Sequence, residues 1–157
     1  MKLYHGTNSS FDKIDLKHCK PNKDFGQGFY LTDLPKQALL MAQRRCDFEE
    51  TGIPVVLTYE FDEDLLSDGT LSVKIFKEVS EEWAEFILKN RRRRTKKEHA
   101  YDIVVGPIAD DGVVYQLNRY EQKMIDLPTL VKELTYKKLN NQYYFGTTKA
   151  ISYLKKL

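Results

Sequence analysis

The sequence Asp24-Phe25-Gly26-Gln27-Gly28-Phe29-Tyr30-Leu31-Thr32 decides the fold class. Its two glycines lead directly into a short aromatic strand, expected over Gly28–Thr32. Asp33 and Pro35 then predict a helix that runs to about Cys46, because an Asp side chain accepts hydrogen bonds from the free amides of a first turn and proline is tolerated there. A strand that passes straight into a helix, whose apolar face should pack on the sheet, indicates a mixed fold.

Four further runs share the character of this strand. Each is short, rich in aromatic or β-branched residues, and flanked by Gly, Asp, Asn or Pro: Lys2–His5, Val55–Phe61, Asp102–Gly106 and Gln142–Phe145. Helices are expected after Ser80, after Asp126, and after Thr147 or Thr148, the last one over Lys149–Lys156. The expected fold class is therefore α+β, with five or six strands in a modest mixed sheet.

Length and composition limit the classes of protein. The chain has 157 residues, of which 41% are hydrophobic and 31% charged, and this size suits a single domain over 1–157. Lys and Arg number 25 against 23 Asp and Glu, so bulk electrostatic binding to nucleic acid or to an anionic membrane is not expected. No apolar run approaches the roughly 18 residues of a membrane span, and the first residues do not resemble a signal peptide.

The cysteines and histidines favour a cytoplasmic protein without a metal. Cys19 and Cys46 are expected to be reduced thiols, because two cysteines in a chain of this size do not make a disulfide framework. The three histidines are scattered in the sequence and lack the spacing of zinc ligands.

Three short segments carry candidate binding chemistry, each with a purely structural alternative. In Tyr4-His5-Gly6-Thr7 the glycine lets the backbone approach a ligand amide, although His5 can equally be satisfied by a backbone carbonyl. Tyr30 can stack on a heteroaromatic ligand, or it can be a core tyrosine with a paired hydroxyl. Gln142, at the start of an aromatic strand, can donate and accept, or it can simply be an exposed strand residue.

The order of these segments resembles the ADP-ribosyltransferase superfamily of the His-Tyr-Glu type, which includes diphtheria-type toxins and poly(ADP-ribose) polymerases. A closer resemblance is to a family of short bacterial proteins that is catalogued as a domain of unknown function and assigned to that superfamily. The blocks that carry it are Leu3–Thr7, Phe25–Thr32, Trp83-x-x-Phe86 with Asn90-Arg91, Tyr101–Asp111, and Asn141-Gln142-Tyr143-x-Phe145.

The resemblance implies a split pair of small mixed sheets with NAD in the cleft between them, and transfer of ADP-ribose with release of nicotinamide. His5, Tyr30 and Gln142 would be the catalytic residues. His5 would hold a ribose hydroxyl, Gly6 would pair its backbone with the nicotinamide carboxamide, and Tyr30 would stack on the nicotinamide ring. The remaining NAD-binding residues would be Thr7, Gly28, Phe29, Met41, Arg91 and Asp111.

Three of these positions, Met41, Arg91 and Asp111, have alternatives, and Asp110 shares those of Asp111. Met41 stands eleven residues after Tyr30, where relatives commonly place a second ring; a thioether can cover a ring face, but Met41 is equally suited to the core. Arg91 can bind NAD phosphates or stabilise its own helix end. Asp110 and Asp111 can supply a carboxylate to the site, or be an ordinary helix cap and a solvated acid.

The main departure from the superfamily is Gln142, where relatives usually have glutamate. A neutral acceptor lacks a full negative charge, so a slow enzyme that makes single transfers is expected, and Gln142→Glu should raise NAD cleavage if charge limits the rate. The alternatives are a catalytically inert NAD-binding module that acts through a protein partner, and an NAD glycohydrolase.

The acceptor is not defined by the sequence, and a protein is favoured over nucleic acid. Many relatives are toxins encoded beside an antitoxin, which adds a protein partner to the expectations. The basic run over residues 89–97 contains seven Lys and Arg. It can dock an acidic protein or RNA, or it can be a solvated helix end.

Overall fold

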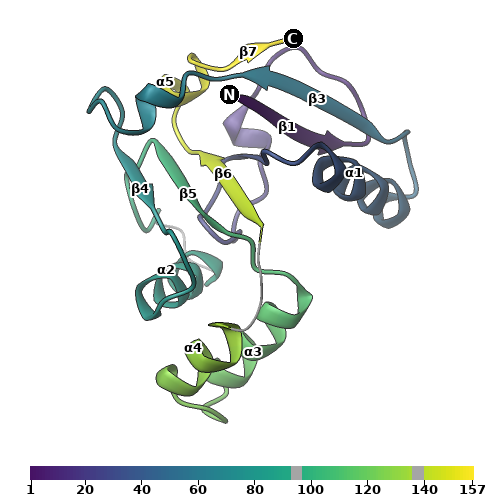
Figure 1. The fold of residues 1–157 in the computed structure, drawn as a ribbon. Helices are drawn as coiled ribbons and strands as arrows, with labels where there is room; N and C mark the ends of the chain where they lie inside the picture. Colours follow the sequence, from purple (N-terminus) through teal and green to yellow (C-terminus); the bar gives the residue numbers. More distant parts are fainter. Residues whose placement is uncertain (93–96, 136–139) are drawn as a thin grey trace.

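In the computed structural model, which describes residues 1–92, 97–135 and 140–157, the strands form two small sheets (Figure 1). The three-stranded sheet has the antiparallel order β1 (Lys2–Thr7), β3 (Val55–Glu60), β7 (Lys155–Lys156). The four-stranded sheet has the order β2 (Phe29–Leu31), β6 (Asn141–Phe145), β5 (Ile103–Pro107), β4 (Val73–Ile75), and only its β4–β5 pair is parallel. The fold is α+β with two small sheets, as the resemblance implied, and only the single modest sheet expected from the strand runs alone is wrong.

Among the described residues, one isolated backbone bridge joins the two sheets, and beyond it their backbones separate. Tyr4 of β1 and Thr32, just after β2, exchange both backbone hydrogen bonds, at 2.8 and 2.9 Å. Successive residues of a strand direct their backbone groups to opposite edges. The N–H and C=O of Gly6 therefore face the same edge as those of Tyr4, but at the point where the sheets have parted.

Alternation along the central strands divides the apolar side chains between two cores. Ile103 and Val105 of β5, with Phe145 of β6, pack between the sheets against Leu3 and Tyr59. Val104 and Tyr144 point the other way, into a second core. This period of two is expected for strands that are buried on both faces.

Helices cover the outer face of each sheet (Figure 1). The second core is closed by α2 (Glu81–Arg91), α3 (Asp111–Glu121) and α4 (Leu127–Thr135). On the three-stranded sheet, α1 (Pro35–Glu49) packs against β1. The short helices are α5 (Thr148–Ile151) and the 3₁₀ turns η1 (Leu16–His18) and η2 (Glu63–Leu66).

The α1 helix approaches β1 so closely that only glycine fits at position 6. A Cβ on Gly6 would lie 1.9 Å from the carbonyl oxygen of Ala38 and 2.8 Å from the amide nitrogen of Ala42. Ala38 and Ala42 are the buried residues of the helix, whereas Leu39 and Met41 are exposed. The contact between sheet and helix is therefore made by small residues rather than by a broad apolar face.

The helix caps were predicted with mixed success. Ser80 caps α2 by accepting from the amide of Trp83, and Asp126 accepts from the amide of Thr129 at the start of α4, as expected. The Asp33 cap on α1 is wrong, because the N-cap residue is Leu34 and makes no side-chain cap bond. Asp33 instead accepts from the hydroxyl of Tyr143, at 3.5 Å.

The predicted C-terminal helix over Lys149–Lys156 is also wrong. Thr147 caps a helix, but it is only the short α5, and the chain then extends into β7. Tyr59 and Glu60 of β3 pair with β7, and Lys156 donates to the carbonyl of Phe11 at 2.7 Å. Pairing at the open edge of β3 thus overrides the local preference for helix.

Candidate active site

A cavity of about 770 Å³ lies beside the point where the two sheets separate. Segments far apart in the sequence line it: the end of β1, the strand β2, one side of α1, the loop before β2, and the first buried residue of β6. A volume of this size lies within the usual range of small-molecule sites. Of the predicted site residues, those that line it are His5, Gly6, Thr7, Gly28, Phe29, Tyr30, Met41, Arg91 and Gln142.

His5 is held in one orientation at the cavity. Its Nδ1 lies 2.8 Å from the carbonyl oxygen of Tyr30, and its ring packs on Phe29 with 4.4 Å between centroids. A carbonyl only accepts, so Nδ1 carries the proton and Nε2 of the neutral ring is an acceptor. Burial lowers the pKa of His5 despite the opposing effect of this hydrogen bond. The structural and the ligand-binding interpretations of His5 are therefore compatible.

Tyr30 holds in place the glycine loop, the segment with Gly26 and Gly28 that precedes β2. Its hydroxyl donates to the carbonyl of Gly26 at 2.7 Å and accepts from the amide of Phe25 at 2.9 Å. Burial raises the pKa of this hydroxyl well above its ordinary value, so Tyr30 stays neutral. His99 holds the same loop from the other side, because its Nε2 lies 2.7 Å from the carbonyl of Phe25.

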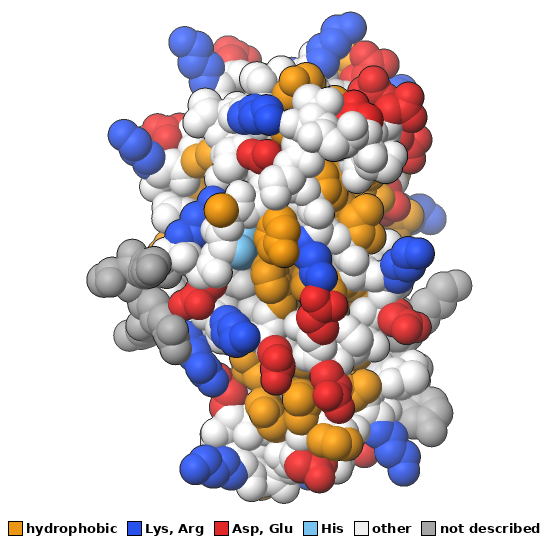
Figure 2. All heavy atoms as spheres, turned by 90° about the vertical axis from the view of Figure 1, so that its left-hand side faces the viewer, with side chains coloured by type: hydrophobic (Ala, Val, Ile, Leu, Met, Phe, Trp, Pro, Cys, Tyr) orange, Lys and Arg blue, Asp and Glu red, His pale blue; other side chains and the backbone are white. Residues whose placement is uncertain are grey.

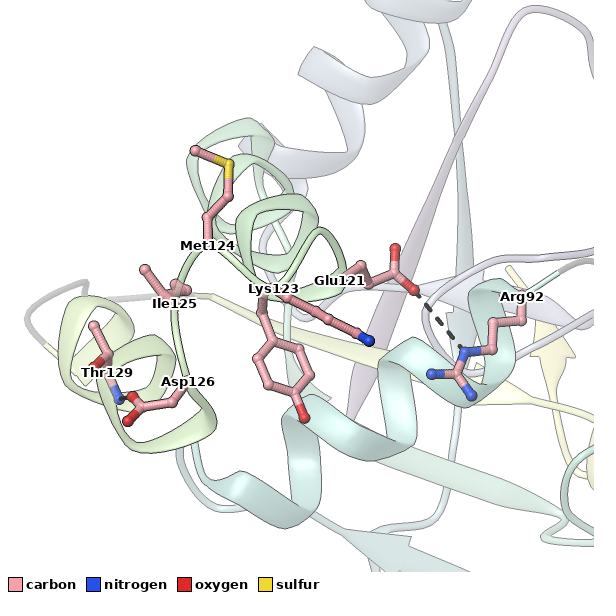
Figure 3. A pocket seen from close by; sticks show the side chains of 8 residues that line it. Arg92, Glu121, Lys123, Met124, Ile125, Asp126 and Thr129 are labelled. Carbon is pink, nitrogen blue, oxygen red and sulfur yellow. Dashed lines mark hydrogen bonds and ion pairs between the residues drawn. The ribbon is translucent and has the colours of Figure 1, made fainter.

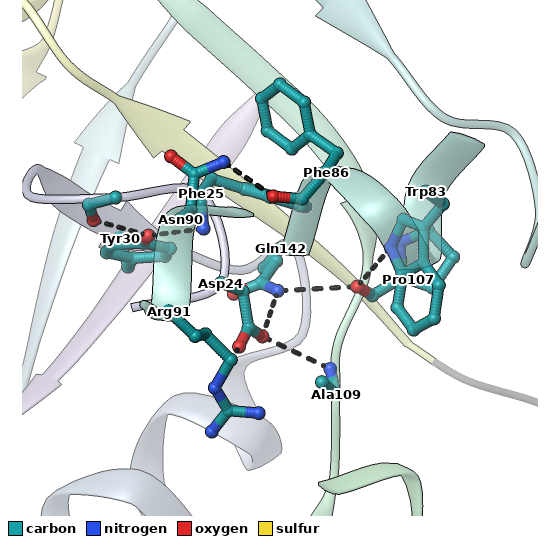
Figure 4. A network of polar contacts seen from close by, with 11 residues as sticks. Asp24, Phe25, Tyr30, Trp83, Phe86, Asn90, Arg91, Pro107, Ala109 and Gln142 are labelled. Carbon is teal, nitrogen blue, oxygen red and sulfur yellow. Dashed lines mark hydrogen bonds and ion pairs between the residues drawn. The ribbon is translucent and has the colours of Figure 1, made fainter. Parts of the chain in front are cut away.

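The amide of Gln142 is the centre of a buried polar network (Figure 4). Gln142 is 9% exposed, and its Nε2 donates to Asp24 Oδ2 at 2.8 Å and to the carbonyl of Pro107 at 3.3 Å. Both partners are acceptors, which fixes the amide nitrogen on their side. Within the described residues Oε1 has no hydrogen-bond partner, so it is the group of Gln142 left for a ligand.

Asp24 was not predicted as a site residue. Its Oδ2 also accepts from the amide of Ala109 at 3.3 Å, and its Oδ1 lies 3.7 Å from Nε of Arg91. It stands 118 residues from Gln142 in the chain. The only sequence signal was its place at the start of the glycine loop, and nothing in that position distinguishes it from a solvated acid.

The rim of the cavity is cationic. Among the described residues that line it, six are Lys or Arg and three are Asp or Glu. One of the acids, Glu49, is already paired with Arg45 at 3.1 Å and Lys20 at 3.6 Å. The face that carries β4 and α2 differs, because its cations are scattered among acids (Figure 2). The cationic rim is thus a local feature of a nearly neutral chain.

Two large apolar side chains of α1, Met41 and Phe48, also border the cavity. Met41 is 44% exposed there, so the alternative that it belongs to the core is wrong. Phe48, which sequence reasoning missed, is 83% exposed at the rim, with Nζ of Lys20 5.7 Å from its ring centroid. An exposed ring at a cavity mouth is a surface on which a planar ligand can stack.

Other predicted residues lie elsewhere. Asp111 is outside the cavity lining, at the exposed start of α3, and Asp110 caps that helix by accepting from the amide of Val113 at 2.9 Å. In the basic run, Arg92 lies 3.9 Å from Glu121, and Lys97 donates to the carbonyl of Gly146. Arg93, Arg94 and Lys96 are outside the described residues.

A second hollow, of about 810 Å³, lies between the end of α2 and the α3–α4 hairpin (Figure 3). Its charged groups serve the fold, because Arg92 pairs with Glu121 and Asp126 caps α4. Within the described chain no group of three His, Cys, Asp or Glu is placed to hold a metal, and no helix is long and apolar enough to cross a membrane.

Residues 1–156 match the model of a family described as Protein of unknown function (DUF3990). The chain belongs to this family. No curated protein and no solved structure gives a match. The match confirms that the chain belongs to a family of unknown function, and it spans every residue that lines the cavity.

The two buried histidines predict a loss of stability in mild acid. Burial lowers the pKa of both His5 and His99 below the ordinary 6.5, so between pH 6.5 and their folded values the native state binds fewer protons than the unfolded state. Stability should be full above about pH 6.5 and fall as the pH drops below it. Thermal unfolding between pH 8 and 5 measures this, and His99→Gln should flatten the slope. A melting temperature that is constant over this range would contradict the prediction.

Proposed function

We propose that this protein is an NAD-dependent mono-ADP-ribosyltransferase that modifies a macromolecular acceptor, for which a protein is favoured. The observation that carries the proposal is the meeting of His5, Gly6, Tyr30 and Gln142 at one cavity where two small sheets part. These are the residues that the resemblance to the His-Tyr-Glu superfamily singles out, and they come from three separate strands.

The donors and acceptors of the cavity suit the nicotinamide riboside end of NAD. The backbone N–H and C=O of Gly6 can pair with the carboxamide, which needs one acceptor and one donor. Tyr30 and Met41 can bound the ring, and Nε2 of neutral His5 can accept from a ribose hydroxyl. His5 and Tyr30 are held by hydrogen bonds of the fold and Gly6 by the close approach of α1, so little ordering of these three residues is required on binding.

The rim of the cavity suits the other half of NAD, its pyrophosphate and adenosine. A pyrophosphate carries negative charge, and Arg44, Arg45 and Arg91 lie around the opening. Adenine is a flat heteroaromatic ring, and the exposed face of Phe48 at the same opening can stack on it.

In the proposed reaction the glycosidic bond between nicotinamide and C1′ of the ribose breaks. The bonding electron pair leaves with nicotinamide, the acceptor nucleophile forms the new bond to C1′, and its proton is released to solvent. The transition state is oxocarbenium-like, so an acceptor near the ribose favours it. Oε1 of Gln142 takes this role by accepting from the 2′-hydroxyl and orienting it.

Incubation of the protein with NAD labelled in the adenosine half, together with a cell lysate, tests the proposal. We expect release of nicotinamide and a labelled acceptor that carries one ADP-ribose per site rather than chains. Nicotinamide release with free ADP-ribose as the only labelled product would make the protein an NAD glycohydrolase. Absence of both products over hours would contradict the proposed activity.

The neutral Gln142 favours a second candidate, an inert NAD-binding module that acts through a protein partner. Such a module would retain the cavity and lack only the charge that accelerates bond cleavage. Calorimetry of NAD binding, together with an assay of nicotinamide release, separates the two functions. NAD binding without nicotinamide release supports the module, and binding with release supports the enzyme.

A further inference from the structure

Asp24, which itself lines the cavity, accepts a hydrogen bond from the amide of Gln142 (Figure 4). Asp24 is a poorly exposed side chain, with 13% of its surface accessible, and its Oδ2 accepts from Nε2 of Gln142 at 2.8 Å. The proposed reaction as described above uses Oε1 of Gln142 and gives Asp24 no part. A poorly exposed carboxylate with an amide as one of its partners nevertheless has two physical consequences for that amide.

The first consequence is orientation. With Nε2 held by Asp24 and by the carbonyl of Pro107, rotation of the amide would bring Oε1 against two acceptors. The second is polarisation. A hydrogen bond to an ionised acceptor is about twice as strong as a neutral one, and successive hydrogen bonds in a chain strengthen one another. Both effects make Oε1 a better acceptor.

We propose that Asp24 is a positioning residue for Gln142, and that through this amide it supplies the negative charge that a neutral glutamine lacks. The inference rests on the proposed function, because it assigns the charge at the same reacting ribose. Arg91 lies at the opposite carboxylate oxygen, 3.7 Å from Oδ1. The carboxylate therefore spans from the cationic rim to the buried amide.

Asp24 also changes what Gln142→Glu should do. With glutamate at position 142, its carboxylate and that of Asp24 would lie about as close together as the Gln142 amide and Asp24 do now, at 2.8 Å. Two carboxylates at this distance share one proton. The substitution alone therefore adds little charge at neutral pH. Charge is moved to position 142 only when Asp24 is neutralised at the same time.

The experiment compares nicotinamide release by four proteins: the wild type, Asp24→Asn, Gln142→Glu, and the double variant that carries both. Asn retains an oxygen that accepts from Gln142 and removes the charge, so we expect kcat to fall at least tenfold with KM changed less than threefold. The double variant should recover to within threefold of the wild type, and Gln142→Glu alone should not exceed it. Asp62→Asn, an exposed cap of η2, removes the same charge away from the cavity and should change kcat less than twofold.

The outcomes separate this inference from the proposed function. A wild type that releases no nicotinamide overturns both. An active wild type with an unchanged kcat in Asp24→Asn overturns the inference alone, as does a loss in Asp24→Asn that the double variant does not recover. If Asp24→Asn fails to fold, the pH profile of Gln142→Glu decides. An added ionisation well above the ordinary range of glutamate is expected, and its absence overturns the coupling to Asp24.

Discussion

Replacement of Gln142 by alanine is expected to lower the rate of nicotinamide release by about 10²- to 10³-fold, the usual effect of removing one preorganised polar group from an active site. The substitution removes Oε1, the acceptor left unpaired in the buried network, while Asp24 retains its contacts with Ala109 and Arg91. Because the loss concerns the transition state, kcat should fall more than the affinity for NAD. Steady-state assays with calorimetry of NAD binding measure both quantities.

Gln43→Ala is the matched control for this substitution. Gln43 is exposed on α1 and does not line the cavity, so the same change of side chain should leave nicotinamide release within twofold of the wild type. The role of this amide would be contradicted if the Gln142→Ala protein shows the thermal unfolding transition of a folded protein and still releases nicotinamide at the wild-type rate.

The sequence predicted the elements whose local signals agree with the final fold. The buried strands around Ile103–Val105 and Tyr143–Phe145 alternate between two cores, and their β-branched and aromatic residues were sufficient to identify them. The capping side chains of Ser80 and Asp126 marked two helix starts. These signals are local. They indicate which residues are buried but not which residues they pack against.

The errors arose where long-range pairing decides the structure. β7 is a two-residue strand that exists because β3 presents a free edge, and nothing in Lys155–Lys156 itself favours extended chain. The strands divide into two sheets, between which the described residues make one isolated backbone bridge, Tyr4 to Thr32. Local periodicity carries no information on either contact, so the strand count alone led to one sheet.

The candidate site shows the same limit. The resemblance to a family supplied His5, Tyr30 and Gln142 because these positions keep an order along the chain. Asp24 belongs to no such ordered pattern in this chain, and its importance follows only from its contact with an amide 118 residues away. Asp110 and Asp111 were the candidates for a carboxylate at the site because they follow a strand that was expected to be buried, but Asp110 caps α3 and neither residue lines the cavity.

Replacement of Gly6 by alanine is expected to be the most destabilising single change at the cavity. The added Cβ would lie 1.9 Å from the carbonyl oxygen of Ala38, so either β1 or α1 must move. Overpacking of this kind costs about 3 kcal/mol or more of unfolding free energy, which is roughly 6–12 °C in melting temperature for a chain of this size. NAD binding should weaken as well, because the displaced backbone of Gly6 is the edge that faces the cavity.

Gly69→Ala is the control, because a Cβ there would meet nothing within 4 Å and the cost is limited to its left-handed backbone at φ +83°, about 1 kcal/mol. The atoms nearest to the new Cβ in Gly6→Ala are backbone atoms of Ala38 and Ala42, so trimming either side chain cannot relieve the clash. Only displacement of β1 or of α1 can do so, and α1 carries Met41, Arg45 and Phe48 at the cavity. Equal melting temperatures for the two variants would show that α1 adjusts freely, and would remove the argument that this helix holds the cavity in a fixed shape.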